Sequence, residues 1–84
     1  MRQGEYSIGV AKVTSLGISF RGIYYSNRVA IKEGWFEKVR WLSNWTVVIM
    51  YNPNNMNTVY VVDRKKNCVI PSESIELRSK YVNY

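Results

Sequence analysis

Short segments of alternating apolar and polar residues fill the first third of the chain. Segment 8–14 alternates imperfectly, as expected for a strand with one face buried and one exposed. Further strands are expected at 18–21 and 23–25, where β-branched and aromatic residues gather. Gly17 marks the first turn and Gly22 breaks or bulges the second strand. The pattern therefore predicts a hairpin-like unit near the N-terminus.

The period of the apolar residues changes after residue 26. Apolar side chains then recur every three or four positions, at Ile31, Trp35, Val39 and Leu42, which is typical of a helix. Ser26 or Asn27 is a suitable N-cap. Gly34 interrupts the pattern, so we expect a short first helix and a second one beginning near Trp35. The helical insertion is expected at about residues 27–42.

The second half of the chain again favours strands. Segment 45–51 (WTVVIMY) is almost continuously apolar, which predicts a strand buried on both faces. The Asn-Pro-Asn-Asn sequence at 52–55 predicts a turn, and 59–63 a partner strand. A last short strand is expected at 68–70, closed by Pro71, with the Cys68 thiol buried and inert.

These elements predict a mainly β fold. Short strands at close spacing with one helical insertion favour a small closed or partly open β-barrel of about 5–6 strands. Closure also removes the sheet edges that so small a domain would expose. We expect one domain over residues 1–84, with its core at about 8–70 and a C-terminal tail at 71–84.

The charge of the chain narrows the class of partner. Twelve Lys and Arg against six Asp and Glu give a net charge of +6. Such a balance favours polyanions, nucleic acid before an anionic membrane, although a basic surface can also serve solubility alone. Phosphate contacts are expected from cations on the first hairpin, the helix start and a basic hairpin tip. The predicted DNA-binding residues are Lys12, Arg21, Arg28, Lys32, Arg64, Lys65 and Lys66.

The aromatic residues allow two interpretations. Five of them could stack on bases, although a barrel this small needs most of them in its core: Tyr24, Tyr25, Trp35, Trp41 and Trp45. The helical segment lacks the Arg, Asn and Gln side chains of a base-reading helix. We therefore expect binding to the phosphate backbone without sequence specificity.

Catalysis by this chain is not expected. The sequence has no His, one Cys and one Asp, and its five glycines are scattered rather than gathered in a phosphate-binding loop. No metal site or cofactor is predicted.

No secretory signal is visible, and the uncharged segment 41–62 is interrupted by an Asn-rich turn that a membrane span does not tolerate. A cytoplasmic location is expected.

The order of these segments resembles a known family. Residues 17–25 (GISFRGIYY), a helical stretch, residues 47–53 (VVIMYNP) and residues 59–62 (VYVV) follow one another here. This order resembles the small β-barrel that follows the catalytic core in Mu-type and Tns-type DDE transposases, which are integrase-like recombinases. The resemblance covers about residues 8–70. Asn52 stands where that family usually has Asp, and the helical stretch is longer than in its shortest relatives.

The resemblance implies a function. Such proteins cut transposon ends and join them to target DNA with divalent metal, using carboxylates of an upstream domain that has no counterpart here. The barrel then contacts double-stranded DNA and takes part in assembly with other transposase subunits. An AAA+ ATPase target selector is a further implied partner. The chain is accordingly interpreted as a domain excised from a larger bacterial transposase, associated with the nucleoid.

Alternatives from other classes remain open at this point. One is a protein–protein assembly module with incidental charge, anchored by Trp35 or Trp41. Others are an RNA-binding barrel and a helix-turn-helix built around Gly34. Salt dependence separates the first from a DNA-binding domain, because only binding that releases counterions weakens steeply with salt.

Overall fold

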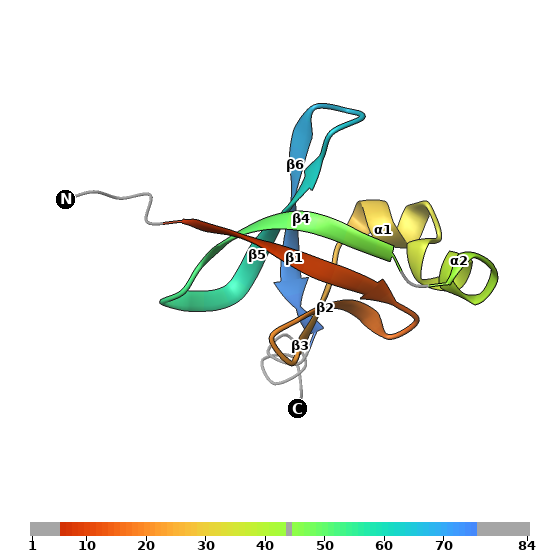
Figure 1. The fold of residues 1–84 in the computed structure, drawn as a ribbon, viewed down its shortest axis with the longest axis horizontal. Helices are drawn as coiled ribbons and strands as arrows, with labels where there is room; N and C mark the ends of the chain where they lie inside the picture. Colours follow the sequence, from red (N-terminus) through yellow and green to blue (C-terminus); the bar gives the residue numbers. More distant parts are fainter. Residues whose placement is uncertain (1–5, 44, 76–84) are drawn as a thin grey trace.

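The computed structural model describes residues 6–43 and 45–75 as six strands and two helices. The elements, in chain order, are β1 (Ser7–Thr14), β2 (Gly17–Phe20), β3 (Ile23–Ser26), α1 (Arg28–Lys32), α2 (Trp35–Leu42), β4 (Trp45–Asn52), β5 (Asn55–Asp63) and β6 (Cys68–Ser74). All strand pairs are antiparallel and close into a barrel in the order β1-β2-β3-β6-β5-β4 (Figure 1). The predicted small barrel with a helical insertion is confirmed.

Closure of the barrel depends on the last strand. β6 forms a hairpin with β5 and then pairs with β3 through Tyr25↔Ser74 and Ser26↔Glu73. The prediction that Pro71 closes this strand and begins a tail is therefore wrong. Pro71 pairs with Tyr60 of β5, and the pairing with β3 begins two residues later, at Glu73. The remainder of the expected tail, residues 76–84, lies outside the described residues.

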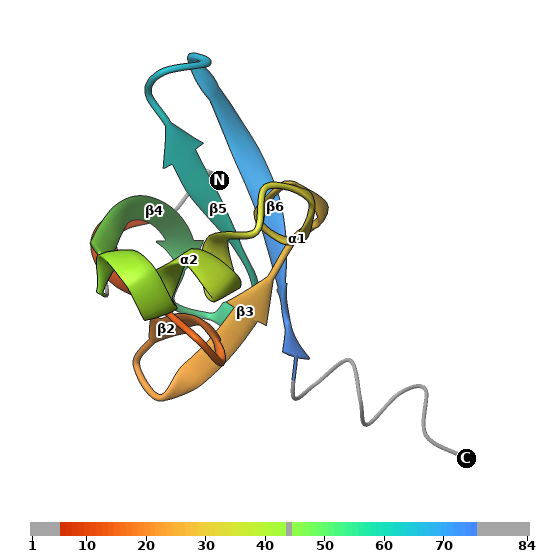
Figure 2. The ribbon, with the colours of Figure 1, turned by 90° about the vertical axis from the view of Figure 1, so that its right-hand side faces the viewer.

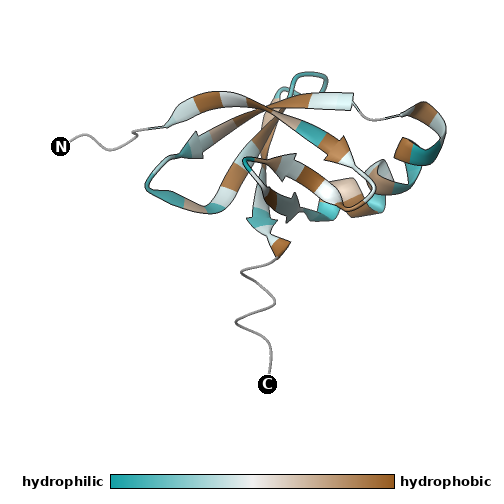
Figure 3. Ribbon diagram, turned by 60° about the horizontal axis from the view of Figure 1, so that its bottom comes forward, coloured by the Kyte–Doolittle hydropathy of each residue, from teal (hydrophilic) through white to brown (hydrophobic). Residues whose placement is uncertain are grey.

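The core fills the inside of the barrel with alternate residues of the strands. Hydrophobic and hydrophilic residues accordingly alternate along parts of the ribbon (Figure 3). Its fully buried members are Val13, Ile18, Tyr25, Ile49, Val59 and Val61. Tyr25 is the largest of them, and its hydroxyl donates to the carbonyl oxygen of Met56 at 2.6 Å. Burial raises the pKa of Tyr25, which therefore stays protonated as a donor.

Two burial predictions are wrong, one because the barrel wall is a single layer and the other because a hairpin projects beyond it. In β4, Ile49 and Tyr51 are buried, whereas Thr46 is exposed, so the strand is not buried on both faces. Cys68 is exposed rather than buried. It alternates in phase with buried Ile70, but it belongs to the end of the β5–β6 hairpin, which projects beyond the barrel (Figure 2).

Local sequence signals place the helices where they were expected. Asn27 caps α1 by accepting a hydrogen bond from the Ala30 N–H at 2.6 Å, and its amide nitrogen donates to Ser72 Oγ at 2.8 Å. This second bond ties α1 to β6. Gly34 separates the helices at φ 69°, and α2 then packs against β1. Arg21 lies in the β2–β3 turn at φ 52° and not in a strand as predicted.

The outer face of β1, β4, β5 and β6 carries a row of apolar side chains. The strand registers Ile8↔Met50, Met50↔Tyr60 and Tyr60↔Pro71 place these four side chains side by side. Ile8 is 72% exposed, and the ring of Tyr6 lies edge-on to Tyr60 with centroids 5.9 Å apart. We call these four residues the outer row. A contiguous apolar surface of this kind is typical of an interaction site.

Candidate nucleic-acid interface

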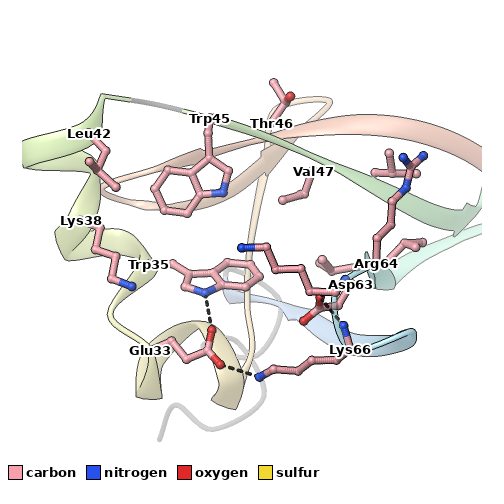
Figure 4. A pocket seen from close by; sticks show the side chains of 14 residues that line it. Glu33, Trp35, Lys38, Leu42, Trp45, Thr46, Val47, Asp63, Arg64 and Lys66 are labelled. Atoms are coloured by element: carbon pink, nitrogen blue, oxygen red, sulfur yellow. Dashed lines mark hydrogen bonds and ion pairs between the residues drawn. The ribbon is translucent and has the colours of Figure 1, made fainter.

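An open groove lies where β4 and β5 separate. The two strands pair from Asn52 up to Ile49↔Val61. The first half of β4 then continues alongside β1, whereas the end of β5 continues alongside β6 into the projecting hairpin. Helix α2 lies beside this opening, and the resulting groove has a volume of about 590 Å³ (Figure 4). The divergence of two neighbouring strands thus creates a hollow in the wall of the barrel.

Cations from two elements line the groove. Lys38 comes from α2, and Arg64, Lys65 and Lys66 come from the turn of the β5–β6 hairpin. Asp63 fixes this turn, since its Oδ1 accepts from the backbone N–H of Lys65 at 3.1 Å and of Lys66 at 3.2 Å. The turn therefore presents its basic side chains from a backbone held in place.

Glu33 joins the hairpin to the helices. Its Oε2 lies 2.7 Å from Nζ of Lys66, and its Oε1 accepts from Nε1 of Trp35 at 3.0 Å. Hydrogen bonds from Lys66 and Trp35 lower the pKa of Glu33, and Glu33 in turn raises the pKa of Lys66. Within residues 6–43 and 45–75, no acidic side chain forms a salt bridge with Lys38, Arg64 or Lys65. Lys66 is thus paired with a carboxylate, whereas the other three cations of the groove have no carboxylate in salt-bridge contact among the described residues.

This chain of contacts predicts a pH-dependent indole signal. The folded pKa of Glu33 is below its ordinary value of 4.5, so the contact is present above pH 4.5 and is lost as the pH falls through the lowered value. We expect the Trp35 indole N–H resonance to shift in NMR spectra with a midpoint below 4.5. In Lys66→Gln the midpoint is expected to rise toward 4.5. The Trp45 indole serves as internal control, and equal midpoints in both proteins would contradict the contact.

The structure does not bring all predicted cations together. Arg64, Lys65 and Lys66 lie at the groove. Lys12 pairs across strands with Thr46, which lines the groove, so Lys12 lies beside its rim.

The remaining predicted cations lie on two other surfaces. Arg28 and Lys32 are exposed on α1, and Arg28 lines a separate hollow of about 450 Å³ against β6. Arg21 donates to the Tyr51 hydroxyl at 3.0 Å, and its guanidinium lies 5.0 Å from the centroid of that ring. Tyr51 is three residues beyond Val48, the last residue of β4 that lines the groove, or about 10 Å along the strand. The predicted cations therefore lie in three separate groups rather than on one face.

Sequence reasoning missed Lys38. It lies three residues after Trp35 and four before Leu42, so all three share one helix face and line the groove. This spacing is visible in the sequence, but a lysine at such a position more often belongs to a solvated helix surface.

The aromatic candidates lie in three different places. Tyr25 is in the core, Trp35 and Trp45 are half-buried in the groove wall, and Tyr24 and Trp41 are exposed.

Metal-binding clusters and membrane-spanning helices are both absent from the described part of the chain. No group of three or more His, Cys, Asp or Glu side chains there is placed to hold a metal ion. None of the helices described is long and apolar enough to cross a membrane.

Comparison with protein families gives one match. The model of the family described as "Mu transposase, C-terminal" matches residues 7–70, about three quarters of the chain. The match begins with β1 and ends within β6. No curated protein and no solved structure matches the chain significantly.

Proposed function

The chain belongs to the Mu transposase C-terminal family, and from this premise we propose that it is a non-catalytic DNA-binding and assembly domain of a DNA transposase. In this proposal it contacts duplex DNA mainly through the phosphate backbone during transposition and DNA integration. No catalytic step and no cofactor are assigned to it. Its proposed location is the bacterial nucleoid, and other transposase subunits and an AAA+ target selector are proposed as further partners.

The groove cations carry this proposal. Lys38, Arg64 and Lys65 surround one opening, and no acidic side chain of the described residues forms a salt bridge with them. Each cation that meets a phosphate displaces condensed counterions, which is the main source of sequence-independent affinity for DNA. Lys12 extends the basic surface beside the rim. Arg21, Arg28 and Lys32 remain proposed contacts on other surfaces, where a bent or long duplex would have to reach them.

We propose that Lys66 supports the structure of the groove rather than binding a phosphate itself. Its ammonium is occupied by Glu33 at 2.7 Å, and that carboxylate also holds Trp35. Its removal would therefore alter the groove rather than simply delete a phosphate contact. The double variant Arg64→Ala/Lys65→Ala is the sharper test, because it leaves the Glu33 contacts in place.

We expect this double variant to flatten the salt dependence of duplex binding. Because the variant can no longer neutralise two of the phosphates, the slope of log K against log salt falls in magnitude by about 1.8. Binding at 0.1 M salt weakens by about 60-fold if the counterion contribution vanishes near 1 M. Fluorescence anisotropy with a random-sequence duplex at several salt concentrations measures both quantities.

The control for this experiment is Arg40→Ala. Arg40 is an exposed cation of α2 outside the groove lining, so its removal should change the slope by less than the amount expected for one phosphate. An unchanged slope in Arg64→Ala/Lys65→Ala would remove the hairpin turn from the DNA-binding surface.

The outer row favours a second candidate function, assembly with other transposase subunits. Ile8, Met50, Tyr60 and Pro71 form an apolar row on the outer face, in which Ile8 and Pro71 are exposed and Met50 and Tyr60 are half-buried. The exposed ring of Trp41, 82% accessible, adds an anchor of the kind that dominates protein interfaces. If duplex binding proves absent at low salt, the charge is incidental and assembly becomes the primary function.

A further inference from the structure

Two indoles form part of the groove wall beside its cations. Trp35 begins α2 and Trp45 begins β4, and their ring centroids lie 6.2 Å apart at an interplanar angle of 65° (Figure 4). In this edge-to-face geometry the rings do not cover each other as they would in a flat stack. Both side chains line the groove, so each leaves ring surface accessible from it. The wall therefore offers aromatic surface to a ligand.

The Trp35 ring is held in one orientation. Its Nε1 donates to Glu33 Oε1 at 3.0 Å, and the other oxygen of that carboxylate binds Lys66. The indole is thus fixed from the hairpin side before any ligand arrives. A ring already held in place loses little conformational freedom on binding, which favours a flat aromatic ligand over a deformable apolar one.

Charge and aromatic surface select the same class of ligand. Lys38 lies on the helix side of the indoles (Figure 4), and Arg64 and Lys65 of the hairpin turn line the same groove, so the ligand carries anionic groups around a flat ring. A duplex offers its phosphates, but its bases are stacked inside and cannot reach the indoles. A single strand offers both, and stacking of bases on aromatic side chains is how many proteins hold it.

We propose that this groove binds an unpaired stretch of DNA, with a base against the indoles of Trp35 and Trp45 and the flanking phosphates on Lys38, Arg64 and Lys65. The inference rests on the proposed DNA-binding function and adds the form of DNA that the groove prefers. The volume of about 590 Å³ lies within the range of small-ligand sites, roughly 300–1,000 Å³, and is large enough for a nucleotide.

The test uses the chain with Trp41→Phe as its background. Trp41 lies outside the groove lining and is 82% exposed, so this change leaves Trp35 and Trp45 as the sole indoles and makes fluorescence report on the groove. Three probes are compared at one salt concentration: a 12-nucleotide oligothymidylate, a blunt duplex with strands of that length, and a fully abasic oligonucleotide of that length. The abasic probe keeps the phosphates and removes the bases without any change to the protein.

We expect oligothymidylate to quench the fluorescence and to bind about 5- to 150-fold more tightly than the abasic strand, the range that stacking of one base gives. It should also bind more tightly than the duplex. Trp45→Leu should lose a similar factor for oligothymidylate and change abasic binding little, with its fold checked by circular dichroism. Lys38→Gln should weaken both single strands.

The outcomes separate the two proposals. Equal affinity for oligothymidylate and the abasic strand, without quenching, would overturn the preference for unpaired bases and leave backbone binding intact. Failure of all three probes to bind at low salt would overturn DNA binding itself, and the present inference with it.

Discussion

Replacing Tyr25 by alanine is expected to lower the free energy of unfolding by about 3–5 kcal/mol, the usual cost of removing a buried aromatic ring. The side chain is fully buried, and its hydroxyl donates to the carbonyl of Met56. Tyr25 also pairs with Ile18 in β2 and with Ser74 in β6. A domain of 84 residues has a stability of about 4–13 kcal/mol, so the variant loses a large share of it. Urea denaturation followed by circular dichroism measures the change.

Two further variants show how much of the loss in Tyr25→Ala comes from the hydrogen bond and how much from the buried ring. Tyr25→Phe keeps the ring and removes the hydrogen bond, so a loss of about 1–2 kcal/mol is expected. Tyr24→Ala removes a neighbouring ring that is 37% exposed on the other face of the same strand, and should cost less than the alanine variant of Tyr25. If Tyr25→Ala unfolds with nearly the free energy of the unmodified chain, the ring is not a core residue.

Gly17→Ala is expected to lower the free energy of unfolding by about 2–5 kcal/mol, the sum of backbone strain and overpacking. Gly17 begins β2 at φ 138°, a conformation that side-chain-bearing residues rarely adopt. A Cβ there would lie 3.0 Å from the backbone oxygen of Tyr25, which the strand pairing holds in place. The same urea experiment measures the loss.

Gly22→Ala is the matched control for this variant. Gly22 also has a positive φ, 80°, but an added Cβ would meet nothing within 4 Å. Its substitution should therefore show the backbone strain alone, about 1–2 kcal/mol. Equal losses in the two variants would mean that the contact with the Tyr25 backbone contributes nothing.

Features fixed by neighbouring residues were predictable from the sequence. The Asn27 cap, the break at Gly34 and the turn at 52–55 each depend on a few adjacent positions. Pro71 shows where local reasoning fails. Proline usually ends a strand, but here β6 continues past it, paired with β5 at Ser72 and Glu73 and with β3 at Glu73 and Ser74. The β3 partner lies almost 50 residues earlier in the sequence.

The site was predictable only in part. The basic turn at 64–66 is a local feature, and the structure places it at the groove. The contact between Lys66 and Glu33 spans 33 residues, so no spacing rule could pair them. The groove itself arises because β4 and β5 diverge after Ile49↔Val61. Both segments have strong strand propensity, which says nothing about where their pairing stops. Lys38 belongs to the site only because it lines that opening.

Pairing of β3 with β6 also has a consequence for synthesis of the protein. A ribosome delivers the chain from its N-terminus, so β1 to β5 emerge before Glu73 and Ser74 can close the barrel. Until then the edge of β3 presents unpaired backbone groups, which are a template for association with other nascent chains. The interval is about 2–10 seconds, the time needed to add the 48 residues from Ser26 to Ser74 at roughly 5–20 residues per second. A fragment that stopped at Ile70, where the family match ends, would keep this edge open permanently.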